Sequence, residues 1–484
     1  MDVTVVVLYL AAMIAFGFWG RRRTRDRSDF LVAGRRLGPW LYSGTMAAVV
    51  LGGASTIGGV GLGYEYGISG MWLVVAIGSG ILVLSSLVSA RIQRLGVFTV
   101  GQMLELRYGT GLGAPAGVVM WAYTLMLSVT STIAYATIFG VLLDIGRVPA
   151  IVVGGIVVVI YSTLGGMWSV TLTDFVQFLI QTIGIFLVLL PVVLWRAGGW
   201  DGLAAAVPAD ALSLTSIGGG TILTYFVTYG FGLLIGQDIW QRVFTARSPG
   251  VARWAGVGAG VYCLAYGVAG ALIGTAAQVI VPGLAERDDA FAAIVDAAMP
   301  PVAAGLVLAA ALSAVMSTSS GALLATATVF KQDLLGRFRP TSGSDDELAG
   351  NRWAVAGFGV VVIVLSGLLQ DVVAALTLAY GILVGGLLVP IIGGLVWRRA
   401  TRAGALAAMA AGTVATLATM LALGDLYANE PVFAGIGSGL VAFVVVSLLT
   451  RPTGDDVRAE WDRRSGRSAD PVSPDAGPLR HRPG

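Results

Sequence analysis

The chain has 484 residues, of which 56% are hydrophobic and 12% are charged, and its mean hydropathy is +0.84. This composition, together with 68 glycines, is typical of a polytopic membrane protein with closely packed helices. The net charge of +3 comes from loop arginines that indicate topology rather than nucleic-acid binding, and the single cysteine and single histidine exclude disulfides, cysteine metal clusters and histidine-based catalysis.

Thirteen apolar stretches along the chain are each near the ~20 residues that a helix needs to cross a bilayer. The first is followed at once by five arginines, whereas a signal peptide carries its positive charge before the apolar stretch, so we expect a retained helix. The expected spans are Val3–Gly20, Trp40–Leu62, Met71–Ala90, Leu112–Leu143, Ala150–Leu164, Thr173–Leu194, Thr221–Trp240, Ala252–Val281, Pro301–Phe330, Trp353–Leu369, Val372–Trp397, Ala403–Leu423 and Pro431–Leu449.

The charges of the loops alternate along these spans. Basic loops follow the odd spans, except for an uncharged loop near Gly165, and acidic loops follow the eighth, tenth and twelfth spans. Arg147, Arg196 and Arg287 are exceptions on the acidic side. Because basic loops stay in the cytoplasm, the pattern predicts an outside N-terminus and an inside C-terminus in the cytoplasmic membrane. The chain after Arg451 lacks apolar periodicity, and we expect it to be a disordered cytoplasmic tail.

Two spans contain clustered glycines that predict breaks in their helices. In the second span, Gly52, Gly53, Gly58 and Gly59 lie around the run Ala54-Ser55-Thr56-Ile57, and in the seventh, Gly230, Gly232 and Gly236 precede Gln237 and Asp238. Five spans separate the two breaks, as an inverted repeat of five helices demands. A broken helix is tolerated inside a membrane where it lines a cavity or binds a ligand.

The ninth span is unusually rich in hydroxyl groups. They belong to Ser313, Ser317, Thr318, Ser319, Ser320, Thr326 and Thr328. Each hydroxyl could bond back to its own helix, but a run this dense favours oxygens directed at one point. Hydroxyls and freed carbonyls bind a monovalent cation without adding charge, so we predict an ion site at Ser317 and Thr318, one turn after Ala314.

Two acidic residues lie near expected helix starts inside the membrane region. Asp174, near the start of the sixth span, is either a helix cap or an acid on the cytoplasmic exit path of an ion. Asp238, after the second break, is either a helix cap paired with Arg242 or a contact for substrate.

These motifs together resemble those of the sodium/solute symporter family, which includes bacterial proline carriers and sodium/sugar carriers. The resemblance covers nearly the whole membrane region. The segments that carry it are Phe30–Leu37, Ala54–Ile57, Gly165–Gln177, Gln237–Arg242, Ala314–Thr318 and the block from Pro390 to Ala405.

The resemblance implies a LeuT-like core of two inverted five-helix repeats, at about residues 40–194 and 221–397 within a core of 39–400. An extra helix and basic loop (1–38) precede the core, and two peripheral helices (401–450) and the tail (451–484) follow it. The resemblance also implies Na+ as the coupling ion. Its ligands would be the main-chain carbonyls of Ala54, Ile57 and Ala314 and the hydroxyls of Ser317 and Thr318.

Departures from the family pattern bear on the solute. Thr56 stands where the proline carriers have an aspartate, Met71 and Gly61 where the sugar carriers have a glutamate and a glutamine, and Asp238 where those carriers have a gate tyrosine. A sugar needs many paired hydrogen bonds in a dry pocket, so sugar transport is disfavoured.

We therefore expect a sodium-coupled symporter, and not an enzyme, that imports a small organic solute by alternating access. An amino acid or a monocarboxylate is favoured, and we expect a monomer in the lipid bilayer with no nucleic-acid partner. The expected solute contacts are Ser55, Thr56, Tyr229, Gln237, Asp238 and Tyr380. The alternatives are a proton-coupled transporter of the same fold and a membrane sensor derived from it, although the tail after Arg451 is too short for a signalling domain.

Overall fold

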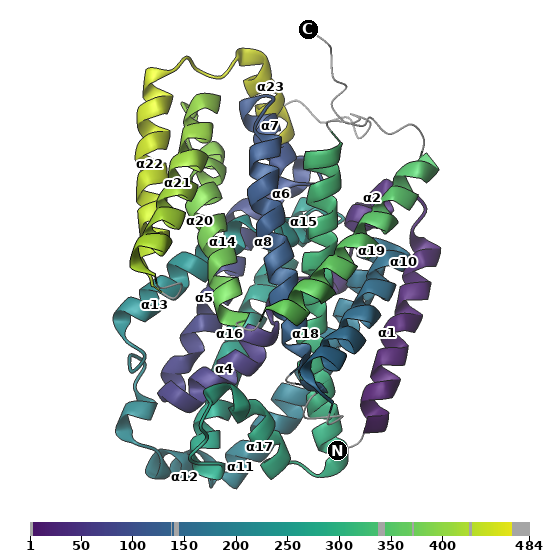
Figure 1. Cartoon of the computed structure of the whole chain (residues 1–484), viewed down its shortest axis with the longest axis vertical. Coiled ribbons are helices and arrows are strands. Elements are labelled where there is room, and N and C mark those ends of the chain that lie inside the picture. The colour runs from purple at the N-terminus through teal and green to yellow at the C-terminus, as the bar shows by residue number, and fades with distance from the viewer. Residues whose placement is uncertain are drawn as a thin grey trace.

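The structure, a computed structural model, is a bundle of helices (Figure 1). It describes residues 3–136, 138–139, 145–336, 344–369, 372–424 and 428–466. In this part of the chain, ten helices are long and apolar enough to cross a membrane, or eleven if the pair Gly219–Ile235 and Gln237–Val243, bent by 47°, forms one span. The expected all-α, polytopic class is confirmed.

The first half of the chain builds the helices up to the end of the sixth expected span and the two short elements that follow it. Their bounds are α1 Val3–Arg23, α2 Arg27–Val32, η1 Ala33–Arg35, α3 Pro39–Val50, α4 Gly53–Tyr66, η2 Gly67–Met71, α5 Trp72–Val83, η3 Leu84–Val88, α6 Ser89–Arg94, α7 Val100–Tyr108, α8 Gly113–Ile133, α10 Arg147–Gln181, η4 Thr182–Leu189, α11 Leu190–Arg196, α12 Gly199–Ala206 and η5 Ala209–Leu212.

The second half begins with the other broken span. Its elements are α13 Gly219–Tyr225, η6 Phe226–Gly230, α14 Phe231–Ile235, α15 Gln237–Val243, α16 Pro249–Ile280, η7 Arg287–Asp289, α17 Ala290–Ala298, α18 Pro301–Val329, η8 Phe330–Leu335, α19 Ser344–Leu368, α20 Val372–Val396, α21 Arg402–Leu423, α22 Glu430–Leu449 and α23 Asp455–Arg464.

The break in the second expected span lies at the first glycine of the predicted cluster, Gly52, and at the residue before it. Helix α3 ends at Val50, and Leu51 and Gly52 adopt non-helical backbone angles before α4 begins at Gly53. The glycines from Gly53 to Gly63 are therefore helical. Several of them serve close packing instead, because a Cβ at Gly63 would lie 2.6 Å from the carbonyl oxygen of Ala271 in α16.

The second break is where the sequence predicts it. Gly236 has an extended backbone conformation (ψ of 133°) and separates α14 from α15. Two long helical stretches are also divided by a glycine with positive φ. Gly67 (φ of 62°) ends α4, so that the following turn packs back on Leu62, and Gly166 (φ of 54°) kinks α10 between the fifth and sixth expected spans.

Helix α18 forms the centre of the bundle. Its residues from Val307 to Val329 are all buried, and it packs against α1, α8, α10 and α19. Small side chains permit this closeness, since a Cβ at Gly184 of the adjoining η4 would meet the Cβ of Ala310 at 2.5 Å. The peripheral pair α21 and α22 packs beside α20 at one edge of the molecule (Figure 1).

The segment after Arg451 differs from the expected disordered tail. Residues 455–464 form the helix α23, which packs against α7. Two contacts hold this helix: Trp461 is 4% exposed and packs against α7, and Arg464 bonds Glu460 one turn away at 2.5 Å. Residues 467–484 lie outside the described part of the chain. The start of α1 and the helix α23 lie at opposite ends of the bundle (Figure 1).

Candidate functional site

The predicted hydroxyl pair of α18 points at the broken end of α3. Ser317 donates to the carbonyl oxygen of Ala48 at 2.7 Å, and Thr318 donates to that of Val49 at 2.7 Å. Both hydroxyls also lie close to the carbonyl oxygen of Ala314, at 2.9 and 3.4 Å. The structure thus brings together an oxygen cluster of two hydroxyls and main-chain carbonyls from two helices, without any charged group.

The other two expected carbonyls belong to a different element. Ala54 and Ile57 lie in α4, beyond the break. In a helix, each main-chain carbonyl accepts a hydrogen bond from the amide four residues further along the chain. The hydroxyls of Ser317 and Thr318 meet the last turn of α3 instead. The position of the break decides which carbonyls the hydroxyls can reach, since the carbonyls of the final turn of a helix have no donor four residues further along it.

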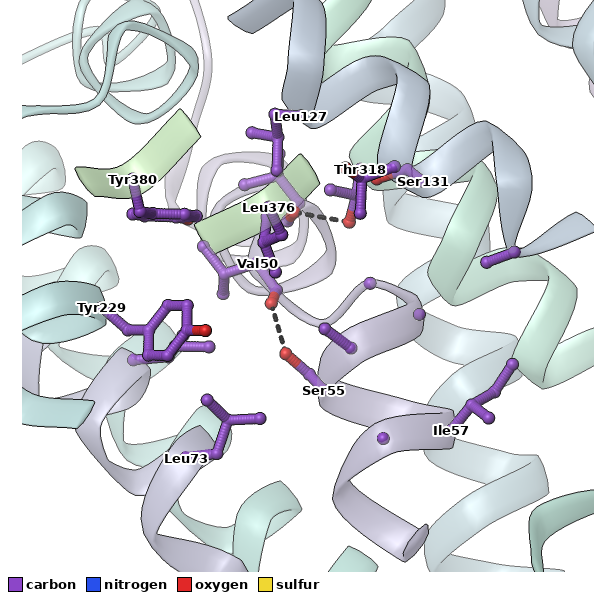
Figure 2. Close-up of a pocket in the computed structure, with 18 of the residues that line it drawn as sticks. Val50, Ser55, Ile57, Leu73, Leu127, Ser131, Tyr229, Thr318, Leu376 and Tyr380 are labelled. Atoms are coloured by element: carbon purple, nitrogen blue, oxygen red, sulfur yellow. Dashed lines mark hydrogen bonds between the residues drawn. The ribbon is translucent and has the colours of Figure 1, made fainter. Parts of the chain in front are cut away.

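A pocket of about 200 Å³ opens beside this cluster (Figure 2). It is lined by the start of α4, by α5 and α8, and by residues of the second broken span and of α20. Four of the six expected solute contacts line it: Ser55, Tyr229, Asp238 and Tyr380. Ala54, Ile57 and Thr318 line it too, so the pocket and the oxygen cluster share a wall.

The remaining two expected contacts, Thr56 and Gln237, do not line the pocket. Thr56 faces α16, where its hydroxyl lies 2.9 Å from that of Tyr266. Gln237 instead ties α15 to the connection between α6 and α7: its amide nitrogen donates to the carbonyl of Phe98 at 3.0 Å, and its amide oxygen accepts from the main-chain nitrogen of Val100 at 2.8 Å.

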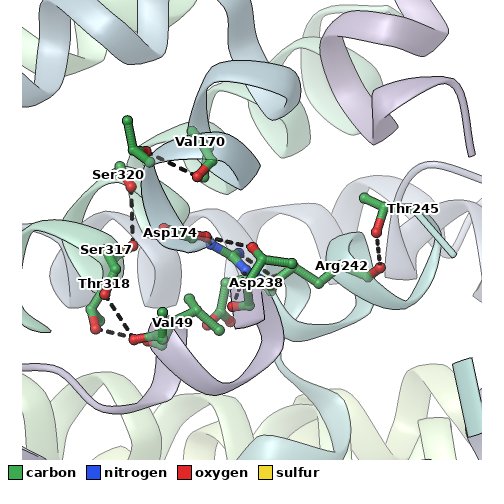
Figure 3. A network of polar contacts seen from close by, with 12 residues as sticks. Val49, Val170, Asp174, Asp238, Arg242, Thr245, Ser317, Thr318 and Ser320 are labelled. Carbon is green, nitrogen blue, oxygen red and sulfur yellow. Dashed lines mark hydrogen bonds and ion pairs between the residues drawn. The ribbon is translucent and has the colours of Figure 1, made fainter. Parts of the chain in front are cut away.

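Asp174 forms a fully buried ion pair with Arg242 (Figure 3). The two side chains are 0% exposed, a nitrogen of Arg242 lies 2.9 Å from Oδ2 of Asp174, and the Thr45 hydroxyl donates to the same oxygen at 2.5 Å. Asp174 lies eight residues beyond the kink at Gly166, inside the helix, and so it is not a helix cap. Its carboxylate links α10 to α3 and α15.

The contacts of Arg242 differ from the expected pairing of Arg242 with Asp238. The guanidinium bonds the main-chain carbonyl of Asp238 at 3.0 Å and that of Thr45 at 3.3 Å, but its ionic partner is Asp174. The side chain of Asp238 accepts a bond from the Tyr123 hydroxyl at 3.2 Å. The guanidinium fits a notch in α18, because a Cβ at Gly321 would come within 2.5 Å of it.

Four features of the site escaped the sequence analysis. The carbonyls of α3 give no side-chain signal, and neither does the pairing of Thr45 with Asp174 across 129 residues. The pairing of Arg242 with Asp174 did carry a signal, since an acid and an arginine that both lie inside membrane spans are usually partners. Tyr123 could be found only through its contact with Asp238.

A helical bundle with two broken helices, a central pocket and an oxygen cluster beside it defines a multi-pass secondary transporter. The family model described as the sodium:solute symporter family matches residues 30–412. The chain therefore belongs to this family.

Relatives and solved structures agree with this assignment. The chain is 26% identical over 468 residues to the high-affinity proline transporter PutP of Bacillus subtilis, covering 93% of this chain and 98% of that protein. It is 26% identical over 475 residues to the sodium/pantothenate symporter of Escherichia coli, covering 91% and 95%. A Na+-coupled sialic acid symporter in a substrate-bound outward-open state has a similar structure, with a TM-score of 0.81 at 18% identity and coverage of 93% and 98%. The fold is thus that of the LeuT-like transporters.

Proposed function

We propose that the chain is a sodium-coupled symporter of the cytoplasmic membrane that imports a small organic solute by alternating access. The observation that carries this proposal is the contact of Ser317 and Thr318 with the carbonyls of the last turn of α3, beside the pocket that Thr318 also lines. A cluster of uncharged hydroxyl and carbonyl oxygens suits a monovalent hard cation. An inward Na+ gradient supplies ~2.3 kcal/mol per charge per 100 mV of membrane potential.

Among the expected ion ligands, the geometry supports Ala314, Ser317 and Thr318. For the carbonyls from the second span, it favours Ala48 and Val49 over Ala54 and Ile57, because the α18 hydroxyls already contact the former pair. Na+ entering the cluster would accept these oxygens as ligands and would replace the bonds between them. Sodium would thereby hold α3 against α18, which links ion binding to the position of the broken helix.

The core would move as two groups of helices. The elements α3 to α6 and α13 to α16 are the first two helices of each expected repeat, and α16 packs against α3, α4 and α5. We infer that this group rocks against α8, α10, α18 and α19. We infer thirteen spans, with the termini on opposite sides of the membrane, by counting the stretches on each side of Gly67 and of Gly166 as separate spans and α3 with α4 as one span.

The solute would bind in the pocket beside sodium, with Ser55, Tyr229, Asp238 and Tyr380 as contacts. Asp174 would act on the inner side of the ion site, on the path by which sodium leaves. Coupling to protons is the second candidate, and the observation that favours it is the unpaired Oδ1 of the buried Asp174, for which the described residues provide no partner.

Uptake by purified protein in liposomes tests the proposal. We expect solute accumulation that requires an inward Na+ gradient and that a K+ gradient of the same size does not support. Accumulation driven by a proton gradient alone, at equal Na+ on both sides, would instead establish the proton-coupled carrier.

A further inference from the structure

One carboxylate lies deep in the pocket with no ion pair of its own among the described residues. Asp238 is 3% exposed and lines the pocket, and its side chain accepts hydrogen bonds from neutral groups: the Tyr123 hydroxyl and the main-chain amides of Asp238 and Ile239. Arg242 lies one turn further along α15, but its charge is balanced by Asp174. A buried carboxylate that faces an apolar cavity requires either a cation or a proton.

The other charged residues that line the pocket lie at its mouth. Arg287 and Asp288 belong to η7, outside the expected spans, and Arg287 is bound to Glu65 at 2.7 Å. The mouth thus carries Arg287 with two acids, Glu65 and Asp288, and the interior carries the carboxylate of Asp238. Because neither end offers a surplus of positive charge, the pocket favours a solute that itself brings a positive charge to the interior.

A row of aromatic rings runs from Asp238 toward the mouth. The ring centroids of Tyr123 and Tyr380 are 5.3 Å apart, those of Tyr380 and Tyr229 are 5.2 Å apart, and those of Tyr229 and Tyr225 are 5.8 Å apart. Aromatic faces attract organic cations, most strongly where water is excluded. Carboxylate and rings together form a site for a positively charged nitrogen.

The opposite wall of the pocket has the reverse polarity. Ser55 and Thr318 lie across the pocket from Tyr229 and Tyr380 (Figure 2). The 14-residue helix α4 begins on this wall, and the first main-chain amides of a helix have no partner within it. The buried hydroxyl of Thr130 also lines the pocket without a partner in the described residues. Free amides and a hydroxyl favour an anion.

Resting on the sodium-symport function above, we propose that the solute is a small amine whose positive nitrogen lies between Asp238 and the Tyr229–Tyr380 wall. A zwitterionic amine places its carboxylate at the start of α4, beside the sodium site. A simple monocarboxylate or a sugar leaves Asp238 buried without a counter-charge. A site built for a charged partner rejects analogues that lack it.

Matched pairs of ligands test the charge requirement directly. Thermal unfolding of the purified protein is followed in saturating Na+ with each amine and with its near-isosteric analogue that lacks the positive nitrogen. Suitable pairs are L-proline with cyclopentanecarboxylate, glycine betaine with 3,3-dimethylbutanoate, and choline with 3,3-dimethylbutanol. We expect stabilisation by at least one amine and none by its partner. Stabilisation by the analogues alone, or equally by both members, overturns the proposal.

Variants of the pocket locate the contact. Asp238→Asn keeps the size of the side chain and should weaken amine binding roughly ten- to a hundred-fold, as expected for a lost charged hydrogen bond. Tyr229→Leu should weaken it several-fold, and Tyr229→Phe, which keeps the ring, serves as the matched control. Unchanged amine affinity in Asp238→Asn would mean that a proton neutralises this carboxylate, and the proposal would fail.

The response of the protein to Na+ distinguishes a failure of the proposed solute class from a failure of the proposed symport function. The hydroxyls of Ser317 and Thr318 bond the carbonyls of Ala48 and Val49, whereas the side chain of Asp238 bonds Tyr123. Na+ alone should therefore stabilise both the parent protein and Asp238→Asn, which also shows that the variant is folded. A parent protein that does not respond to Na+ contradicts the symport function. A protein that responds to Na+ but binds no amine contradicts only the solute class.

Discussion

At the scale of single residues, the partner of a hydroxyl decides whether it can serve an ion. Thr326 donates to the carbonyl of Ala322, one turn back in its own helix, at 2.8 Å. Ser317 and Thr318, on the same helix, reach carbonyls of α3 instead. The sequence offers three similar side chains, but only the tertiary contact of two of them creates a site between elements.

Removal of either hydroxyl should weaken sodium binding. A lost contact to a buried ion costs about 1–3 kcal/mol, so Ser317→Ala and Thr318→Ala should each raise the Na+ concentration for half-maximal uptake by roughly five- to a hundred-fold. Thr326→Ala is the matched control and should leave this concentration unchanged. Equal Na+ dependence in all three variants would remove the ion site from α18.

The ion pair of Asp174 and Arg242 predicts a different kind of loss. Because both side chains are fully buried, Asp174→Asn leaves the guanidinium without a counter-charge and should cost about 3–5 kcal/mol of stability. The double variant Asp174→Asn with Arg242→Gln should recover part of this loss, which a double-mutant cycle of thermal unfolding measures. Additive effects of the two changes would show that the pair contributes nothing as a pair.

Transport by the Asp174 variant tests its place on the exit path. If the negative charge helps sodium to leave toward the cytoplasm, Asp174→Asn should slow turnover and spare equilibrium Na+ binding. Uptake rate and Na+-dependent stabilisation are compared on one preparation. Normal turnover would restrict Asp174 to a structural role, and lost Na+ binding would make it part of the primary ion site.

At the scale of helices, the span from Pro301 was predicted nearly to its end, whereas only the first glycine of the cluster in the second span, Gly52, lies at its break. Long apolar runs specify a helix by length alone. A glycine, in contrast, serves equally for a break and for close contact between helices, and the sequence does not distinguish the two uses. Gly58 and Gly63 are helical, while the break lies at Leu51 and Gly52. The choice of ion-binding carbonyls depends on this position.

The position of the break predicts the effect of adding one methyl group. A Cβ at Gly52 would lie 2.5 Å from the hydroxyl oxygen of Thr318, so Gly52→Ala should displace this hydroxyl and lower Na+ affinity. A Cβ at Gly58, in the adjoining helix, meets nothing within 4 Å, and Gly58→Ala is the control. Calorimetric titration with Na+, without solute, compares them. Equal affinities would place the ion away from the break.

At the scale of the whole molecule, the sequence predicts the class and the family, because hydropathy and ordered motifs are properties of the chain itself. It does not predict the pocket as a whole. Tyr123, Asp238 and Tyr380 come from three helices and meet only after packing. The helix α23 was missed for a related reason, since Trp461 is buried by α7 and not by its own segment.

The orientation in the membrane is the last prediction, and single cysteines test it. The native Cys263 is fully buried, so a membrane-impermeant thiol reagent should not reach it. Asp210, near the end that carries the start of α1, and Asp455, at the start of α23, are both exposed. Because basic loops remain in the cytoplasm, Asp210→Cys should react in intact cells, and Asp455→Cys only after the membrane is permeabilised. Reaction of both in intact cells would contradict the odd number of spans, and the reverse pattern would invert the molecule and turn the mouth at Arg287 toward the cytoplasm.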